Sequence, residues 1–138
     1  MRRDMTKQAV QLDAVVAPRP HRAAQVMVVD DDPHFRSLVR SLLEPAGITV
    51  LEAGDAREGF RCIHSHEIGV IVLDVMLPGD DGFKTLHVLK AAFPRIKVLI
   101  ATALYLHNTI PLDADGVLCK SEIEQLLPLV DQLIGASK

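Results

Sequence analysis

Short apolar runs alternate with segments of helical period five times along this chain, and this alternation constrains the fold more than any other feature. The runs are Val26–Val29, Ile48–Leu51, Val70–Val75, Val98–Ala101 and Gly116–Cys119. Runs of this length, separated by helices, are typical of parallel strands that are buried on both faces. The sequence therefore predicts an α/β domain of (βα)5 order, with helices on both sides of a parallel sheet.

The segment after the first strand has clear signals for the start and the end of a helix. Asp32 suits the N-cap and Pro33 suits the first helical position. Pro45 and Gly47 are expected to end the helix. Between them, apolar residues recur at the spacing of one helical face: Phe35, Leu38, Val39, Leu42 and Leu43.

The remaining helices are predicted from the same kinds of signal. The chain is expected to be helical over Asp55–His66, over Phe83–Phe93, and from Leu104 to a stop before Pro111. The last helix is expected to open with a capping box formed by Ser121 and Glu124. Pro128 is expected to kink this helix.

Length and composition indicate one globular domain. The chain has 138 residues, of which 49% are apolar and 24% charged, so it can bury a core of its own. Residues 1–24 have no sustained apolar period and are predicted to be a disordered N-terminal arm, with residues 25–138 forming the domain. No apolar run approaches the roughly 20 residues that span a bilayer, so no membrane insertion is expected. Cys62 and Cys119 form no disulfide framework, which favours free thiols in a reducing, cytoplasmic compartment.

The net charge of −3 is unevenly distributed along the chain. Residues 1–25 contain five basic and two acidic side chains, whereas the rest contains ten basic and sixteen acidic ones. Because nucleic-acid phosphates require a basic face, the acidic domain is not expected to bind DNA directly.

Polar side chains stand at the ends of four of the five predicted strands. Asp30 and Asp31 follow the first strand, Asp74 ends the third, and Thr102 and Lys120 follow the fourth and fifth. A single Asp in such a place is ordinarily a turn residue or a helix cap. Parallel strands, however, bring their carboxyl ends to one edge of the sheet, where ligands bind. Three converging carboxylates there predict a Mg²⁺ (or Mn²⁺) site, beside which an anion such as a phosphoryl group is expected to bind.

These segments resemble the receiver domain of bacterial two-component response regulators. The resemblance rests on Val-Val-Asp-Asp-Asp-Pro at 28–33, Val-Leu-Asp-Val-Met-Leu-Pro-Gly-Asp-Asp-Gly at 72–82, Ala-Thr-Ala at 101–103 and Leu-Cys-Lys at 118–120. It covers about residues 26–135 and implies a receiver of the single-domain type. It implies a flavodoxin-like three-layer sandwich with the strand order 2-1-3-4-5.

The resemblance also implies a role for each site residue. Asp74 corresponds to the phosphoacceptor, and the acidic pair Asp30 and Asp31 to the residues that hold Mg²⁺ together with Asp74 and the backbone carbonyl of Met76. Thr102 and Lys120 correspond to the groups that contact the phosphoryl oxygens. Such a domain assists its own phosphorylation and dephosphorylation and turns over no small molecule, so no enzyme activity on a small substrate is expected.

The sequence departs from the family at three places. Ser121 stands where a proline usually follows the lysine, and Val117 stands where an aromatic residue is usual. The segment from Thr102 to Lys120 is short by about one helical turn, which predicts a shortened fourth helix. These differences concern the surface that a downstream partner usually reads.

Two functions remain open at this point. The first is a phosphoacceptor that takes its phosphoryl group from a histidine kinase or a histidine phosphotransfer protein and then changes its contact with a downstream protein. The second is an atypical receiver-like interaction module that works without phosphorylation. The intact Asp30, Asp31, Asp74, Thr102 and Lys120 favour the first. A monomer or a weak dimer is expected in both cases.

Overall fold

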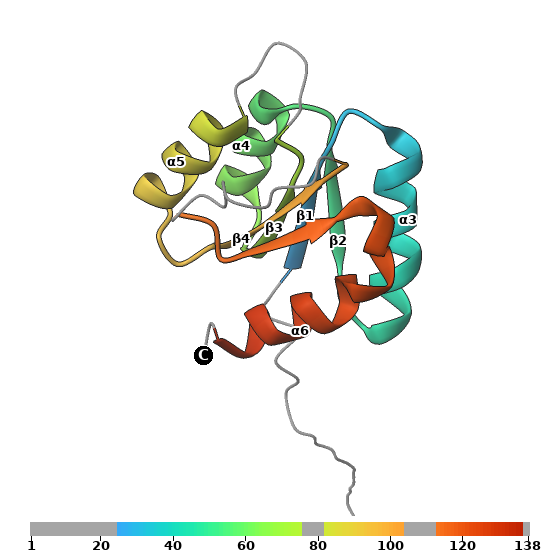
Figure 1. Cartoon of the computed structure of the whole chain (residues 1–138). Helices are drawn as coiled ribbons and strands as arrows, with labels where there is room; N and C mark the ends of the chain where they lie inside the picture. Colours follow the sequence, from blue (N-terminus) through green and yellow to red (C-terminus); the bar gives the residue numbers. More distant parts are fainter. Residues whose placement is uncertain (1–24, 76–81, 104–112, 137–138) are drawn as a thin grey trace, which may run out of the picture.

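A computed structural model describes residues 25–75, 82–103 and 113–136 of the chain (Figure 1). The predicted arm over 1–24, Met76 and the whole of the predicted short helix from Leu104 to before Pro111 lie outside these described residues. None of the helices within them is long and apolar enough to cross a membrane.

The described residues form a five-stranded parallel sheet of order β2-β1-β3-β4-β5, which confirms the predicted fold and strand order. The strands are β1 (Gln25–Val29), β2 (Val50–Ala53), β3 (Ile68–Leu73), β4 (Lys97–Thr102) and β5 (Gly116–Cys119). The helices are α3 (Pro33–Leu43), α4 (Ala56–Ser65), α5 (Gly82–Ala92) and α6 (Leu126–Ala136), with short 3-10 helices η1 (Glu44–Ala46) and η2 (Lys120–Gln125).

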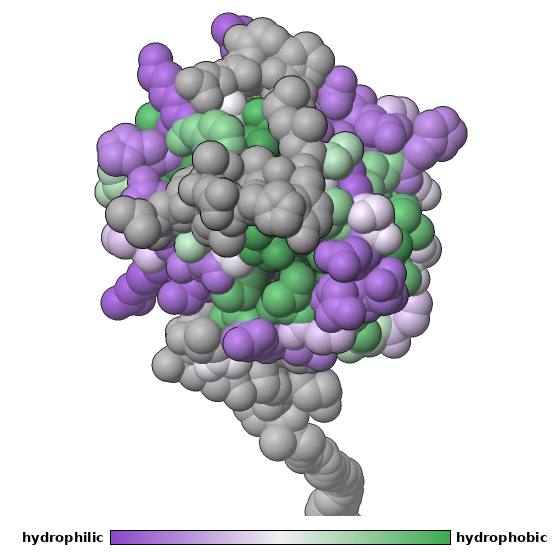
Figure 2. All heavy atoms as spheres, viewed as in Figure 1, coloured by the Kyte–Doolittle hydropathy of each residue, from purple (hydrophilic) through white to green (hydrophobic). Residues whose placement is uncertain are grey.

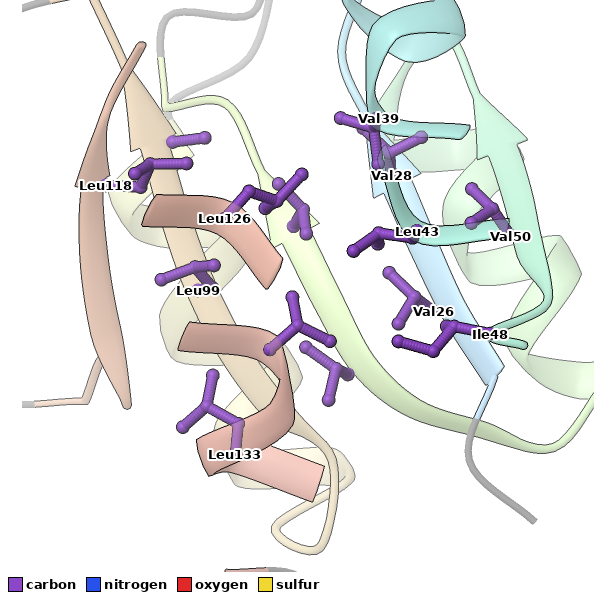
Figure 3. Close-up of a cluster of buried hydrophobic side chains, with 14 of the residues drawn as sticks. Val26, Val28, Val39, Leu43, Ile48, Val50, Leu99, Leu118, Leu126 and Leu133 are labelled. Atoms are coloured by element: carbon purple, nitrogen blue, oxygen red, sulfur yellow. The ribbon is translucent and has the colours of Figure 1, made fainter. Parts of the chain in front are cut away.

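Alternate strand residues build two separate cores, one on each face of the sheet. Val26, Val28 and Leu99 point toward α3 and α6, where they pack with Val39, Leu43, Leu126 and Leu133 (Figure 3). Met27, Val29 and Ile100 point the other way, toward α4 and α5. Burial on both faces explains why the strands are almost wholly apolar. In Figure 2, both hydrophilic and apolar side chains reach the surface on this side of the molecule.

The predicted caps form at the first two helices. The Asp32 carboxylate accepts a hydrogen bond of 2.9 Å from the His34 N–H, with Pro33 in the first turn of α3. Asp55 caps α4 by accepting from the Glu58 N–H at 2.8 Å. Gly47 ends the first helical segment with φ of +87°, a conformation that favours glycine.

Two strands occupy different residues from those that the sequence predicts. The second strand is Val50–Ala53 rather than Ile48–Leu51, because the ladder with β1 begins at Val50. Ile48 is buried but lies outside the ladder, because an apolar side chain indicates burial and not strand pairing. The third strand begins at Ile68 and ends at Leu73, so that Asp74 directly follows it.

The prediction for the last helix was wrong at its start. No side chain caps η2, which occupies Lys120–Gln125 with a break in helical geometry at Glu122. The α-helix begins only at Leu126, so the capping box of Ser121 and Glu124 does not open it. Pro128 therefore lies in the first turn of α6, where proline is tolerated, and the bend lies at Glu122 instead.

Candidate functional site

The ends of β1 and β3 bring two aspartates together at the carboxyl edge of the sheet. The Asp30 N–H donates to the Ala53 carbonyl and the Asp74 N–H to the Val29 carbonyl, both at 3.0 Å. These bonds hold the two residues in line with neighbouring strands. Both are buried, with 0% of Asp30 and 6% of Asp74 exposed.

Asp31 joins these two residues in an acidic cluster, defined here as Asp30, Asp31 and Asp74. One carboxylate oxygen from each lies within 4.8 Å of the other two, and Asp31 is exposed. Two oxygens on opposite sides of a Mg²⁺ ion lie about 4.2 Å apart, since each metal–oxygen distance is about 2.1 Å. The all-oxygen composition and the spacing of the acidic cluster therefore fit a hard divalent cation.

Lys120 brings a single positive charge to the acidic cluster. Its Nζ donates to Asp30 Oδ2 at 2.7 Å and to Asp74 Oδ2 at 3.3 Å. Lys120 is the first residue after β5, so the fifth strand delivers it to the edge where β1 and β3 end. Among these four described side chains, one ammonium faces three carboxylates, an excess of negative charge that a divalent cation would offset.

The electrostatics of the site follow from burial and from crowding of like charges. Burial raises the pKa of the Asp30 carboxyl, and the nearby Asp74 charge raises it further, although hydrogen bonds from Lys120 and the Asp32 N–H act in the opposite direction. Burial alone would lower the pKa of the Lys120 ammonium, but its contacts with Asp30 and then Asp74 outweigh burial and hold that pKa above its ordinary value.

The first turns of α3 support the site with contacts that sequence reasoning missed. The Asp32 N–H donates to Asp30 Oδ1 at 2.9 Å. Arg36 Nη1 donates to the backbone carbonyl of Asp30 at 2.7 Å, while its Nε pairs with Glu52 on β2 at 2.9 Å. The ring of Phe35 lies under the Lys120 ammonium, at 4.3 Å from Nζ to the centroid. The sequence indicates Phe35 only as part of an apolar helix face. Its contact with Lys120 leaves no local signal, because the two residues are 85 positions apart in the chain.

The other predicted site residues are placed in part. Thr102 ends β4, is fully buried, and is the register partner of Cys119, the residue before Lys120. The carbonyl of Met76 lies outside the described residues. Residues 76–81 are bracketed by Val75 and Gly82, whose backbones touch, and a Cβ on Gly82 would overlap the backbone of Val75. A glycine is therefore required where the chain returns to the end of β3.

Comparison with protein families decides what kind of domain carries this site. The response regulator receiver domain matches residues 26–131 of the chain. The chain belongs to this receiver domain family. Among solved structures, the response regulator TrrA of Thermotoga maritima in complex with Mg²⁺-BeF is 26% identical, with a TM-score of 0.71 over 80% of this chain and 98% of that one. The receiver domain of the Francisella response regulator 1452 is 28% identical, with a TM-score of 0.75 over 83% of this chain and 99% of that one.

Curated relatives extend well beyond the segment that they share with this receiver domain. The nitrate/nitrite response regulator NarP of Escherichia coli is 35% identical over 109 residues, which are 75% of this chain and 51% of NarP. The transcriptional regulator of C4-dicarboxylate transport DctD of Pseudomonas aeruginosa is 35% identical over 88 residues, which are 64% of this chain and 18% of DctD. The likeness thus concerns the receiver domain, whose acidic cluster and Lys120 are consistent with phosphoacceptor signalling.

Proposed function

We propose that this receiver domain accepts a phosphoryl group on Asp74 in a reaction that depends on Mg²⁺ or Mn²⁺, and that the modification switches its contact with a partner protein. One observation carries the proposal: Lys120 Nζ bridges Asp30 and Asp74 at 2.7 and 3.3 Å, with Asp31 completing a cluster of carboxylates within 4.8 Å. The site thus combines a cation-binding set of oxygens, a carboxylate nucleophile and a nearby ammonium.

Asp30, Asp31 and Asp74 would hold the metal, together with the carbonyl of Met76. Bound Mg²⁺ supplies positive charge beside the phosphoryl oxygens and so lowers the repulsion between them and the carboxylates. The Arg36 bond to the Asp30 carbonyl and the Asp32 N–H bond to the Asp30 carboxylate keep the first ligand in place.

Asp74 acts as the nucleophile. One of its carboxylate oxygens forms a bond to phosphorus while the phosphorus–nitrogen bond of a phosphohistidine donor breaks, and that electron pair returns to the imidazole. Lys120 Nζ, which already reaches Asp74 at 3.3 Å, donates to a phosphoryl oxygen, and the Thr102 hydroxyl donates to another. The charge that develops on the phosphoryl oxygens is therefore met in part by an ammonium that already lies beside Asp74.

The chemistry of the donor defines the first partner class. A histidine kinase or a histidine phosphotransfer protein would supply the phosphoryl group, and a downstream protein would read the modified domain in the cytoplasm. Residues 25–138 form the receiver domain in this proposal, with 1–24 as an arm outside it. The domain works as a monomer or weak dimer and turns over no small metabolite.

The proposal is tested by incubating the full chain with acetyl phosphate, either with Mg²⁺ or with excess chelator, followed by mass spectrometry of the intact protein and its peptides. A single added phosphoryl group, found on Asp74 and only with Mg²⁺, is expected. A phosphoryl group on another residue would contradict the assignment. If neither acetyl phosphate nor a phosphorylated donor protein modified the chain, with or without Mg²⁺, the interaction module that works without phosphorylation would be favoured.

A further inference from the structure

The Lys120 ammonium has a third contact of a different kind from its two carboxylate contacts. The ring centroid of Phe35 lies 4.3 Å from Nζ, well within the roughly 6 Å over which an aromatic face attracts a cation. The Lys120 side chain is 21% exposed and Phe35 is 7% exposed, so little water separates ring from ammonium. Such contacts are stronger where both groups are partly desolvated.

The Phe35 ring is held firmly enough to act as a support. It lies one residue after His34, whose N–H is bonded to the Asp32 cap, so the first turn of α3 is fixed by a hydrogen bond of 2.9 Å. The ring is also part of the core between the sheet, α3 and α6, which includes Val39 and Leu126. Close packing of this kind leaves a buried ring few alternative positions.

The three contacts of Lys120 respond differently when the site is occupied. Asp30 and Asp74 attract the ammonium through charges that bound Mg²⁺ and a phosphoryl group would engage. The ring of Phe35 is neutral and bears no metal ligand, so its attraction for the ammonium does not depend on the state of the carboxylates. Phe35 thus offers Lys120 a contact that does not require a free carboxylate.

We propose that Phe35 is a positioning residue for the phosphoryl-transfer site: its ring face holds the Lys120 ammonium beside Asp74 when the carboxylates are engaged by metal and phosphoryl group. The inference rests on the proposed function, because it assigns Lys120 to a phosphoryl oxygen. Phe35 would thus affect the binding of the phosphoryl group, whereas metal binding would depend on the acidic cluster.

The contact itself is tested in the metal-free full-length protein by NMR. The ε-methylene protons of Lys120 are expected at unusually high field in the wild type, because they lie near the face of an aromatic ring. Phe35→Met removes the ring and should return these protons to their ordinary position, whereas Phe35→Tyr should keep the shift. An ordinary Lys120 shift in the wild type would overturn the inference.

The role is tested by titrating beryllofluoride, a phosphoryl mimic, into each variant saturated with Mg²⁺. Phe35→Met is expected to weaken beryllofluoride binding by about 2- to 30-fold, the range that corresponds to one cation–π contact. The Mg²⁺ dissociation constant, measured separately by calorimetry, should change less than about twofold. Phe35→Tyr should keep most of the wild-type affinity, because it retains both the aromatic face and the volume of the ring.

Phe60→Met provides the matched control. Phe60 lies on α4, on the opposite face of the sheet, and is partly buried, so this variant also removes a phenyl ring from a core. It should leave beryllofluoride binding unchanged. Equal weakening in both variants, or a parallel loss of Mg²⁺ affinity in Phe35→Met, would overturn the inference.

Two outcomes separate this inference from the proposed function. A wild-type protein that binds Mg²⁺ but no beryllofluoride would overturn the proposed function and the inference with it. A wild-type protein that binds beryllofluoride as tightly as its Phe35→Met variant would overturn the inference alone.

Discussion

The two edges of the sheet each contain a close lysine–aspartate pair, with different surroundings. At the amino edge, Lys90 of α5 contacts Asp115, just before β5, at 2.8 Å. At the carboxyl edge, Lys120 contacts Asp30 at 2.7 Å. The distances and the lysine exposures, 17% and 21%, are almost the same, so the geometry of the pair does not distinguish the two edges.

The difference lies in what surrounds each pair. Lys90 also donates to the Ile96 carbonyl at 2.9 Å, and Asp115 also accepts from the Val98 N–H at 2.8 Å. These further bonds are to the backbone, so this pair ties α5 to the start of β4. Lys120 instead faces a second buried carboxylate, Asp74, with Asp31 nearby. A balanced pair stabilises the fold, whereas an excess of negative charge is suited to binding a cation.

The largest expected effect is on phosphorylation, which should depend on the aspartate at the carboxyl edge and not on the one at the amino edge. Asp74→Asn should abolish the phosphoryl group added by acetyl phosphate and Mg²⁺, because the amide is not a nucleophile. Asp115→Asn should leave the modification intact. Mass spectrometry of both variants checks this, and a modified Asp74→Asn protein would break the comparison.

Replacing each lysine by methionine compares how much the two lysines contribute to the free energy of unfolding. Lys90→Met should lower the free energy of unfolding by about 1–3 kcal/mol, with or without Mg²⁺, because it leaves Asp115 without its ammonium partner. Lys120→Met should destabilise the metal-free protein, since Asp30 and Asp74 then lose the ammonium that both contact. Added Mg²⁺ should recover more stability in Lys120→Met than in the wild type.

Urea unfolding with and without Mg²⁺ measures both effects. The comparison would fail if Mg²⁺ stabilised Lys90→Met and Lys120→Met by the same amount.

A smaller effect is expected at the exposed member of the acidic cluster. Asp31→Asn should weaken Mg²⁺ binding at least about fivefold, because one charge contact near the surface contributes on the order of 1 kcal/mol or more. The metal-free protein should be as stable as the wild type or more so, since one repelling charge is removed. Calorimetric titration and thermal melting check the two parts.

Asp32→Asn is the control for Asp31→Asn, because asparagine also caps α3 while it removes a neighbouring charge. A loss of Mg²⁺ affinity as large as that of Asp31→Asn would show that general charge, and not ligation, is responsible. Clear destabilisation of metal-free Asp31→Asn would contradict the expected repulsion.

The smallest expected effect is on the pH dependence of stability. Because the folded-state pKa of Asp30 is raised, the native protein binds its proton more tightly than the unfolded chain does. Stability of the metal-free protein should therefore fall as pH rises from the unfolded-state pKa through the folded-state pKa of Asp30, by less than about 1.4 kcal/mol per pH unit. Asp30→Asn should flatten this slope in urea unfolding, and an unchanged slope would contradict it.

Much of the fold was predictable because its signals are local. Buried parallel strands need apolar runs, and the capping residues Asp32 and Asp55 act on N–H groups within three residues of themselves. The meeting of Asp30, Asp31 and Asp74 was also predictable, since adjacent parallel strands deliver their carboxyl ends to one edge. The sequence alone thus determined the parallel sheet, the helices α3, α4 and α5, and the acidic cluster.

The tertiary structure decided what depends on distant partners. Pairing with β1, not apolar content, set β2 at Val50–Ala53, and the non-helical Glu122 delayed α6 until Leu126. The contact between Phe35 and Lys120 and the bond from Arg36 to the Asp30 carbonyl depend on how α3 packs at the sheet edge. No local pattern encodes such contacts, because they join residues whose separation is fixed only when the helices and strands are packed together.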